Sequence, residues 1–586
     1  MRPVNRSGTA PLATLVVLAA ACAPAEGPAL AADLVLFNGT VLTVDEADRV
    51  ATALAVRGRH IVAVGDDADI LRFAGPSTER VDLHGRTATP GLLDAHAHFL
   101  AGGANRLFNL DLSYPGVQSI ADVLELVAGR VATVEPGEWI TGAGWDEGKL
   151  EELRYILASD LDDVAPENPV WLEHTMGHYG TANSMAMRLA GLQSSTPDPV
   201  GGTIDRGADG RLTGVLKERA QGLVRRLVPG YSDEQVRAGI KDLARAFNRE
   251  CMTGAKDPGI DSDGWAAYQD VLAQDSLSVR LFALWRVGRT VAAARDVIER
   301  IAPFTRPYVS TGDDRLISGG VKLYMDGSGG ARTAWMYEDW NRARDSLDAG
   351  NRGYPATPPD VLREQIRLFH DAGIHVSVHA IGDRGIDWVV DSYESALDAN
   401  AIRGLRHGII HANIPTDHAL DVMARLQREY DAGYPEPSAT FMWWIGDTYA
   451  GNFGVARSKR LDPFRTFLSR EIRWAGGSDF GVTPYAARYG IWASVARQAE
   501  RGVYGATPFG TDESVDVHTA LRSFTRWSAH QLFLEDRIGS LEPGKYADIA
   551  VWDRNPYDVP TDDLRDMRCE MTVFDGTIVF DAEWEG

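Results

Sequence analysis

The sequence predicts an α/β protein: a (β/α)8 TIM barrel, a small β-sandwich formed by the two ends of the chain, and a large insertion after the first barrel strand. Through the middle of the chain, short apolar runs alternate with segments of helical spacing, as in a parallel barrel. Strand-and-turn patterns without long helices occupy both ends. About 150 residues separate the first two strand candidates, far more than a connecting loop needs.

The composition excludes several classes of protein. The chain has 586 residues, 44% of them hydrophobic, which is enough for a large core. Its net charge of −23 argues against binding nucleic acid or an anionic membrane surface through bulk electrostatics. The cysteines are Cys22, Cys251 and Cys569, and Cys22 falls in the N-terminal leader. At most one disulfide is therefore available, and the fold is not a disulfide scaffold.

Residues 1–32 are predicted to be an export leader, because two arginines precede the apolar run 10–21. Two outcomes of processing are open. Cleavage after residues 29–31, Ala-Leu-Ala, would release a soluble protein, whereas lipid attachment at Cys22, which follows three alanines, would leave a lipoprotein. We expect a bacterial protein that is exported, either periplasmic or lipid-anchored, with no transmembrane span in its mature form.

Residues 33–88 and 538–586 are predicted to form the β-sandwich. The pair Asn38-Gly39 separates two alternating apolar runs, which is a strong hairpin signal because both residues tolerate positive φ. The C-terminal segment also contains strand patterns with no long helix between them. We therefore expect the two ends of the chain to pair, with the barrel, 89–537, inserted between them.

The barrel is predicted from eight strand candidates, most of which precede a segment of helical spacing. The candidates are 91–96, 253–257, 279–285, 320–325, 374–379, 408–411, 439–444 and 474–479. The insertion, about 104–245, follows the first strand and is expected to act as a lid that shapes the substrate pocket. Active sites of such barrels lie at the carboxyl ends of the strands.

The candidate metal ligands lie near the ends of five of these strands. His96 and His98 are two residues apart, so they point the same way from the end of a strand. The other candidate ligands are Lys322, His379, His411 and Asp479. Neutral imidazoles and carboxylates are common ligands of divalent metals. We expect two zinc ions, with one ion, or manganese, iron or cobalt, as alternatives.

Lys322 has two interpretations. As a carbamate formed with carbon dioxide, it would bridge two metal ions; as an ammonium, it would pair with Asp326 or another carboxylate. The carbamate needs a neutral amine, which burial favours by lowering the pKa of the lysine.

Asp479 is the predicted catalytic residue. Metals of this kind polarise a carbonyl and lower the pKa of water. The aspartate can take a proton from that water and deliver it to a leaving nitrogen. The combination predicts hydrolysis of a carbonyl–heteroatom bond.

Seven separated motifs, in the same order, resemble the amidohydrolase superfamily, and within it family 3, the YtcJ-like metal-dependent hydrolases. The matching segments are 90–98, 142–146, 321–328, 379–383, 406–411, 477–479 and 539–548. The resemblance covers nearly the whole mature chain and implies a distorted TIM barrel with a β-sandwich. It also implies metal binding by His96, His98, His379 and His411, with Asp479 catalytic and a carboxylated Lys322 as bridge. Lys256 and the pair Trp443-Trp444 depart from the expected pattern, which bears on the substrate.

Several residues are candidates for contact with the substrate. By the resemblance, His178 is expected to face the substrate from the lid, whereas His174 is either packed or exposed to solvent. Trp145, Trp443 and Trp444 are expected to line an apolar or aromatic pocket, although tryptophans also serve simply as core residues.

Other residues are candidates for supporting roles. Asp383 either accepts the free ring N–H of a metal histidine or caps the helix that begins near it. His407 is expected to support the metal site. Arg457 and Arg460 either meet a substrate carboxylate or lie in a solvated loop.

The sequence therefore predicts an exported, metal-dependent hydrolase of C–N bonds other than peptide bonds. We expect a small N-acyl, formamide-like or cyclic amide as substrate and no nucleic-acid partner, with a homodimer as a further hypothesis. An ester or lactone is the nearest alternative, because the same water attacks either carbonyl. A binding lipoprotein that kept the barrel and lost the chemistry is the alternative from a different class.

Overall fold

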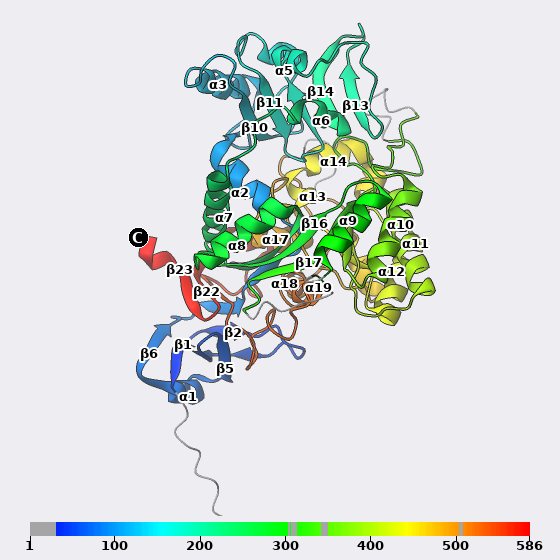
Figure 1. The fold of residues 1–586 in the computed structure, drawn as a ribbon. Coiled ribbons are helices and arrows are strands. Elements are labelled where there is room, and N and C mark those ends of the chain that lie inside the picture. The colour runs from blue at the N-terminus through cyan, green and yellow to red at the C-terminus, as the bar shows by residue number, and fades with distance from the viewer. Residues whose placement is uncertain (1–30, 303–304, 306–312, 341–349, 503–507, 586) are drawn as a thin grey trace, which may run out of the picture.

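The computed structural model describes residues 31–302, 305, 313–340, 350–502 and 508–585. Cys22 and nearly all of the predicted leader lie outside these residues. Figure 1 shows the β-sandwich at the bottom, the barrel in the middle and the inserted sheet at the top. No helix in the described part of the chain is long and apolar enough to cross a membrane.

The β-sandwich consists of two sheets, with strand orders β5-β4-β1-β6 and β23-β22-β21-β7-β2-β3. The strands are β1 (Ala32–Phe37), β2 (Thr40–Leu42), β3 (Val50–Ala51), β4 (Ala53–Arg57), β5 (His60–Gly65), β6 (Ala74–Asp82), β7 (Thr87–Pro90), β21 (Ile549–Trp552), β22 (Cys569–Phe574) and β23 (Thr577–Asp581). In the second sheet β21 pairs antiparallel with β7, so Ile549 lies opposite Pro90. A strand from the C-terminal segment thus lies beside the strand that leads into the barrel.

The described barrel sheet contains seven parallel strands in the order β20-β19-β18-β17-β16-β15-β8. They are β8 (Leu92–Asp94), β15 (Met252–Ile260), β16 (Arg280–Arg286), β17 (Leu316–Tyr324), β18 (Val376–Ala380), β19 (Gly408–His411) and β20 (Tyr434–Glu436). All nine residues of β15 are buried, as expected for a strand covered on both faces. The predicted α/β barrel architecture is confirmed, with two corrections described below.

Helices cover the outer face of this sheet (Figure 1). They include α7 (Asp233–Asn248), α8 (Ser262–Ala273), α9 (Val291–Ile301), α10 (Pro359–Asp371), α11 (Asp383–Ala399) and α12 (Asp417–Tyr430). In α10, Leu362, Ile366 and Phe369 follow helical spacing and are fully buried. Thr416 caps α12 by accepting the backbone N–H of Ala419.

The predicted seventh strand, 439–444, is wrong. Most of this run is helix α13 (Thr440–Trp444), and the seventh strand is β20, a few residues earlier. A short run of bulky apolar residues is compatible with either a buried strand or a buried helix, and periodicity cannot separate them.

The predicted eighth strand, 474–479, is not a regular strand, yet it closes the barrel. Ala475 N–H donates to the Pro435 carbonyl (3.2 Å) on one side, and Ala95 N–H donates to the Gly476 carbonyl (2.9 Å) on the other. At Gly477 an added Cβ would lie 2.9 Å from the Cβ of His96, so this close approach requires glycine. We call residues 474–479 the closing segment.

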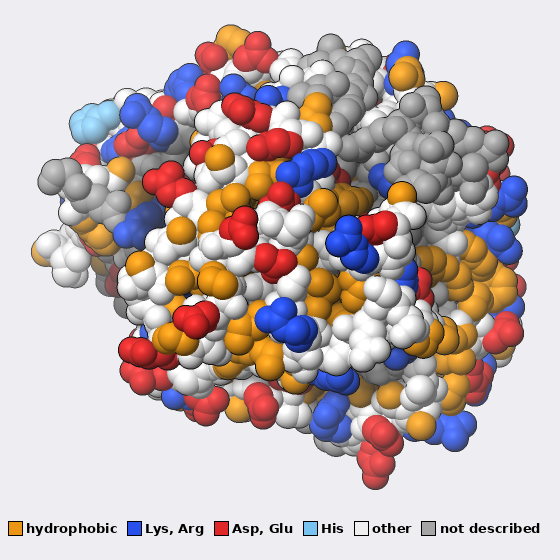
Figure 2. All heavy atoms as spheres, turned by 90° about the horizontal axis from the view of Figure 1, so that it is seen from above, with side chains coloured by type: hydrophobic (Ala, Val, Ile, Leu, Met, Phe, Trp, Pro, Cys, Tyr) orange, Lys and Arg blue, Asp and Glu red, His pale blue; other side chains and the backbone are white. Residues whose placement is uncertain are grey.

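The insertion forms a six-stranded sheet of its own, with the order β13-β14-β12-β11-β10-β9. Its strands are β9 (Leu110–Asp111), β10 (Ile140–Trp145), β11 (Val170–His174), β12 (Tyr179–Ala182), β13 (Gly202–Arg206) and β14 (Leu212–Glu218). Helix α3 (Ile120–Val131) packs against it through the buried Val123 and Val127. On the face seen from above in Figure 2, the described acidic and basic side chains are interspersed, and the basic ones form no continuous patch.

Two buried connections join the barrel to the β-sandwich. The Arg280 guanidinium, at the start of β16, donates to both carboxylate oxygens of Asp548 (2.7 and 3.0 Å) and to Asp575 (2.9 Å). A disulfide joins Cys251 to Cys569, with their Cα atoms 5.4 Å apart. The barrel and the chain ends are therefore coupled by charge and by a covalent bond.

We expect Arg280→Met to lower the free energy of unfolding by about 3–5 kcal/mol, because it leaves the buried Asp548 carboxylate without its cation. Urea denaturation measures this change. Arg211→Met is the matched control, since Arg211 and its partner Asp209 are both exposed, and it should cost less than about 1 kcal/mol. Equal free energies of unfolding for the two variants would show that the buried ion pair between Arg280 and Asp548 does not stabilise the fold.

Candidate metal site

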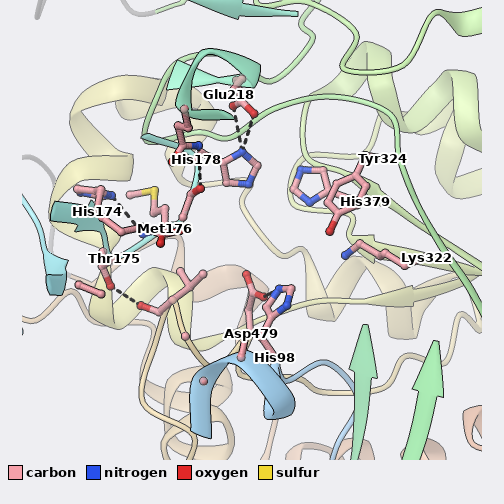
Figure 3. A pocket seen from close by; sticks show the side chains of 18 of the residues that line it. His98, His174, Thr175, Met176, His178, Glu218, Lys322, Tyr324, His379 and Asp479 are labelled. Carbon is pink, nitrogen blue, oxygen red and sulfur yellow. Dashed lines mark hydrogen bonds and ion pairs between the residues drawn. The ribbon is translucent and has the colours of Figure 1, made fainter. Parts of the chain in front are cut away.

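A cavity of about 360 Å³ lies where the carboxyl ends of the barrel strands meet the insertion. Its lining includes the predicted ligands His98, Lys322, His379, His411 and Asp479. In Figure 3, Lys322 and His379 point into this space from one side and Asp479 and His98 from below. His96 is fully buried beside them. The structure therefore brings all six predicted ligands together.

Asp479 lies at the centre of the ligand group. Its Oδ1 atom is 3.2 Å from Nε2 of His96 and 3.2 Å from Nε2 of His98. The Nζ atom of Lys322 lies 3.4 Å from Nε2 of His96. The ligand atoms of His96, His98 and Asp479 all lie within 4.8 Å of one another, which is close enough for one metal ion to contact them.

His379 and His411 complete the group from adjacent strands. Ala380 is the pairing partner of His411 across β18 and β19, so the two histidines end neighbouring strands, and their ring centroids are 4.8 Å apart. Nε2 of His379 donates to the Gly327 carbonyl (2.9 Å), which leaves Nδ1 unprotonated and able to bind a metal.

The predicted role of Asp383 as partner of a metal histidine is therefore wrong. Gly327 holds His379, whereas Asp383 accepts the backbone N–H groups of Tyr337 (2.9 Å) and Arg384 (2.7 Å) where α11 begins. The ring N–H of His379 is accepted by a backbone carbonyl rather than by a carboxylate. Because every residue has a backbone carbonyl, the sequence does not identify this acceptor.

Two candidate ligands have strained backbone conformations. His411 has φ of 69° and Asp479 has φ of 56°, in the left-handed region that residues other than glycine seldom adopt. Such conformations cost on the order of 1–3 kcal/mol each and persist only where the surrounding structure imposes them. Both residues end the segments that carry them, so this backbone geometry sets the direction of their side chains.

The buried carboxylate of Asp94 fixes the closing segment against β8. Its Oδ1 atom accepts the backbone N–H groups of His96 (2.9 Å) and Ser478 (3.0 Å), and its Oδ2 atom accepts the Ser478 hydroxyl (2.5 Å). Burial raises the pKa of Asp94 to about 7, although these hydrogen bonds oppose the shift. Asp94 lies inside a predicted motif, but the sequence analysis assigned it no role.

The protonation states of the group suit a divalent metal. Burial, together with the charge of Lys322, lowers the pKa of His96 well below its usual value, and burial lowers that of His411 to about 3. Burial opposes ionisation of Asp479, but its contacts with His96 and His98 hold its pKa well below the usual range. Neutral imidazoles and an ionised carboxylate are the forms that bind metals.

Asp479 also has an unpartnered atom that fits a metal. Within the described residues, its Oδ1 atom is buried and has no hydrogen-bond partner, although it lies between Nε2 of His96 and Nε2 of His98. Buried polar atoms are almost always satisfied in native proteins. The donor set and this unpartnered atom therefore fit one or more divalent ions, which the six candidate ligands would hold.

Lys322 forms no ion pair with the described carboxylates. Burial lowers its pKa to about 7. Asp326, its suggested partner, instead accepts the backbone N–H groups of Trp335 (2.8 Å), Ile381 (3.0 Å) and Gly382 (2.9 Å). The interpretation of Lys322 as the ion-pair partner of Asp326 is therefore wrong.

The lid contributes a histidine–glutamate pair. Nδ1 of His178 donates to the two carboxylate oxygens of Glu218 (3.0 and 3.1 Å), and its ring centroid lies 5.2 Å from that of His379 (Figure 3). Burial opposes protonation of His178, but Glu218 raises its pKa overall. Glu218 also accepts the Thr333 hydroxyl (2.5 Å) and has φ of 50°. Glu218 is not among the predicted site residues, and its only signal in the sequence is its place at the end of a hairpin strand.

The three tryptophans are not among the residues that line this cavity, contrary to expectation. Trp145 is fully buried in the core of the insertion and donates its ring N–H to the Leu172 carbonyl (3.2 Å). Trp443 is also buried, and its ring N–H donates to Glu500. Trp444 covers the ammonium of Lys149, 3.3 Å from the ring centroid. Large apolar rings are more often core than pocket, and that is the outcome here.

His407, Arg457 and Arg460 also lie away from the candidate ligands. Nε2 of His407 is 3.0 Å from Nδ1 of His370, and its Nδ1 accepts the Val376 N–H, so its expected support of the metal site is wrong. Arg457 and Arg460 line a separate cavity of about 270 Å³ with other residues of the outer loops.

His174 belongs to a second buried cluster, with Asp146 and Glu147. Its Nε2 atom lies 3.0 Å from Glu147, while its Nδ1 accepts the backbone N–H of Met176 (3.1 Å). Because Nδ1 accepts a hydrogen bond, the proton of the ring is on Nε2, which then has no lone pair for a metal. This cluster is a hydrogen-bonded network in the wall of the cavity.

Together, the parallel barrel and the histidine–aspartate group at its carboxyl end define a metal-dependent hydrolase. Residues 79–580 match the model of the amidohydrolase family, and the chain belongs to that family. The family resemblance inferred from the motifs is thereby confirmed.

Two relatives and one solved structure show the extent of this similarity. The N-substituted formamide deformylase of Arthrobacter pascens is 27% identical over 569 residues, covering 94% of this chain and 98% of the relative. YtcJ of Bacillus subtilis, named as an amidohydrolase, is 28% identical over 519 residues, covering 87% and 92%. A metal-dependent hydrolase of Pyrococcus horikoshii has a TM-score of 0.69 at 24% identity, covering 90% of this chain and 99% of that one. This likeness supports the fold.

We expect His96→Ala to lose at least half of the bound divalent metal, because it removes a buried imidazole at the centre of the ligand group. Elemental analysis of protein purified without chelators measures the metal content. His84→Ala is the control, since His84 is exposed on the β-sandwich, and it should leave the content unchanged. Equal metal content in both variants would show that His96 is not a ligand.

Proposed function

We propose that this protein hydrolyses C–N bonds other than peptide bonds in small N-acyl, formamide-like or cyclic amides. The observation that carries the proposal is the position of the Asp479 carboxylate, 3.2 Å from two histidines in a cavity that three further candidate ligands line. This arrangement places a proton acceptor beside a metal site. The formamide deformylase among the relatives supports an amide substrate.

Asp479 acts as general base and then general acid. Bound divalent ions would supply Lewis acidity, which polarises a carbonyl and lowers the pKa of water. The Asp479 carboxylate takes a proton from the attacking water and delivers it to the leaving nitrogen as the C–N bond breaks. Asp94 holds the closing segment, so the carboxylate stays beside His96 and His98 through both transfers.

His178 stabilises the charge that develops on the substrate oxygen. Glu218 raises the pKa of His178, and the imidazolium that this favours donates from Nδ1 to Glu218 and can also donate from Nε2 to a ligand in the cavity that both residues line. A fixed donor aimed at a developing oxyanion lowers the barrier of acyl transfer. Glu218 is a positioning residue, because it acts through His178.

His96, His98, His379, His411 and Asp479 would hold the divalent metal, which we propose to be two zinc ions, and a carboxylated Lys322 would add an anionic ligand to them. The amine of Lys322 is buried, its pKa is lowered to about 7, and it pairs with no described carboxylate, so a substantial neutral fraction exists near pH 7. The neutral amine adds to carbon dioxide and loses one proton to give the carbamate. The carbamate is an anion, so it would replace the unpaired ammonium of Lys322, which would otherwise lie as a cation among the metal ligands.

We also propose that the protein is exported, either as a periplasmic protein or as a lipoprotein anchored at Cys22. The leader pattern is one support, and the disulfide between Cys251 and Cys569 is another. Structural disulfides persist mainly in oxidising compartments such as the periplasm.

We expect Asp479→Asn to lower kcat for an N-formyl amine by about 10²- to 10⁴-fold, because the amide cannot accept the proton of water. The matched control is Asp462→Asn, at a buried aspartate that hydrogen-bonds Asn413 and does not line the cavity. Steady-state kinetics on an amide and its matched ester, with metal content measured in parallel, separate loss of the base from loss of metal. Turnover within threefold of the parent would reject the role of Asp479.

We expect Glu218→Gln to lower kcat about tenfold or more with little change in KM, because it weakens the hold on the His178 ring. Glu173→Gln is the control: Glu173 lines the same cavity but pairs with Arg225 (3.4 Å), and its loss should change kcat less than threefold. Partial recovery by Glu218→Asp would support a positioning role. A change confined to thermal stability would instead indicate a structural role.

A further inference from the structure

Three arginines in the cavity have no carboxylate partner. Arg219, Arg286 and Arg289 all line it, and none of them forms an ion pair with a described residue. Arg225 differs, because it lines the same cavity but pairs with Glu173. The chain has 82 acidic and 59 basic residues, so carboxylates are abundant. Arg219 and Arg286 are exposed, so water can solvate them, whereas the half-buried Arg289 calls for an explanation.

Arg289 has a buried hydrogen-bond donor without a partner. Its side chain is half-buried, and its Nη1 atom is fully buried with no hydrogen-bond partner in the described structure. A buried donor without a partner destabilises the protein, and more so when the donor is charged. Its guanidinium carbon lies 5.9 Å from the ring centroid of Tyr324, which also lines the cavity and is two residues from Lys322. The unpartnered donor is therefore near the metal ligands.

The other two arginines reach the cavity from different elements. Arg286 is the last residue of β16, and its Nε donates to the Gly259 carbonyl (3.1 Å), which orients the guanidinium. Arg219 follows Glu218 in the insertion. Glu218 attracts Arg289 electrostatically, but its carboxylate oxygens accept hydrogen bonds from His178 and Thr333 and form no ion pair with these arginines. Barrel and lid thus both contribute positive charge to one cavity.

We infer that Arg289, assisted by Arg286 and Arg219, binds a carboxylate carried by the substrate. The preferred substrates are then small amides that bear a carboxylate at a distance from the scissile C–N bond. The inference rests on the proposed amide hydrolysis and narrows its substrate class. Guanidinium groups bind carboxylates through paired, charge-assisted hydrogen bonds, and a cavity of about 360 Å³ is of the size that holds small ligands.

Selectivity follows from the buried donor. A carboxylate in the cavity compensates the charge of the Arg289 guanidinium, which forms no ion pair in the described structure, whereas a neutral amide of the same length leaves this charge without a partner. Hydrogen bonds to charged groups contribute about 1.5–3 kcal/mol. We therefore expect about a 10- to 100-fold preference in kcat/KM for the acidic member of a matched pair.

The kinetic test compares N-formyl derivatives of amino acids with increasing chain length, from glycine to 6-aminohexanoate, with the N-formyl alkylamines of the same lengths. At the best length, Arg289→Gln should raise KM for the acid at least tenfold and change kcat/KM for the neutral amide less than threefold. Arg295→Gln, at an exposed arginine on α9 that does not line the cavity, should change neither. No preference for acids at any length would overturn the inference.

A binding test does not depend on turnover. In isothermal titration, glutarate should bind the parent at least tenfold more tightly than Arg289→Gln, while glutaramide should show no such difference. If no amide is hydrolysed but the glutarate difference is present, the proposed function fails and the carboxylate site stands. If amides are hydrolysed and the glutarate difference is absent, the site fails alone. Inorganic phosphate that binds more tightly than glutarate, and depends on Arg289, would overturn carboxylate in favour of a phosphoryl group.

Discussion

The buried carboxylate of Asp94 holds together the two segments on which the candidate metal site depends. It hydrogen-bonds the backbone of His96 and both the backbone and hydroxyl of Ser478, across a sequence separation of 384 residues. The other barrel strands are aligned by regular ladders, but the closing segment is not a regular strand. A side chain therefore supplies the alignment that brings Asp479 to 3.2 Å from His96.

The barrel and the insertion contribute different residues to the site. The barrel supplies the candidate metal ligands, and burial lowers the pKa values of His96, His411 and Lys322. The insertion supplies His178 and Glu218, which face those ligands across the cavity (Figure 3). Neither part contains a complete reaction centre, so the cavity depends on their packing. Arg280 and the disulfide between Cys251 and Cys569 join this barrel to the β-sandwich.

Much of the site was predictable, because its ligands are placed by local rules. Residues two apart point the same way from a strand end, as His96 and His98 do, and parallel strands present their carboxyl ends at one edge. The failures have a common cause. Trp145 and Trp443 are core residues rather than pocket residues, and only packing separates the two roles. Glu218 carries no motif, and its role exists only because the folded hairpin brings it to His178.

Taken alone, the sequence determined the kind of protein: a parallel barrel with histidines, a lysine and an aspartate near its strand ends, and motifs that resemble one superfamily. Periodicity and residue chemistry are local properties, so they can be read without a structure. The tertiary structure decided which groups are in contact. The Gly327 carbonyl rather than Asp383 accepts the ring N–H of His379, and Arg289 rather than Arg457 lines the cavity. These contacts join residues distant in the chain, so packing selects among chemically equivalent partners.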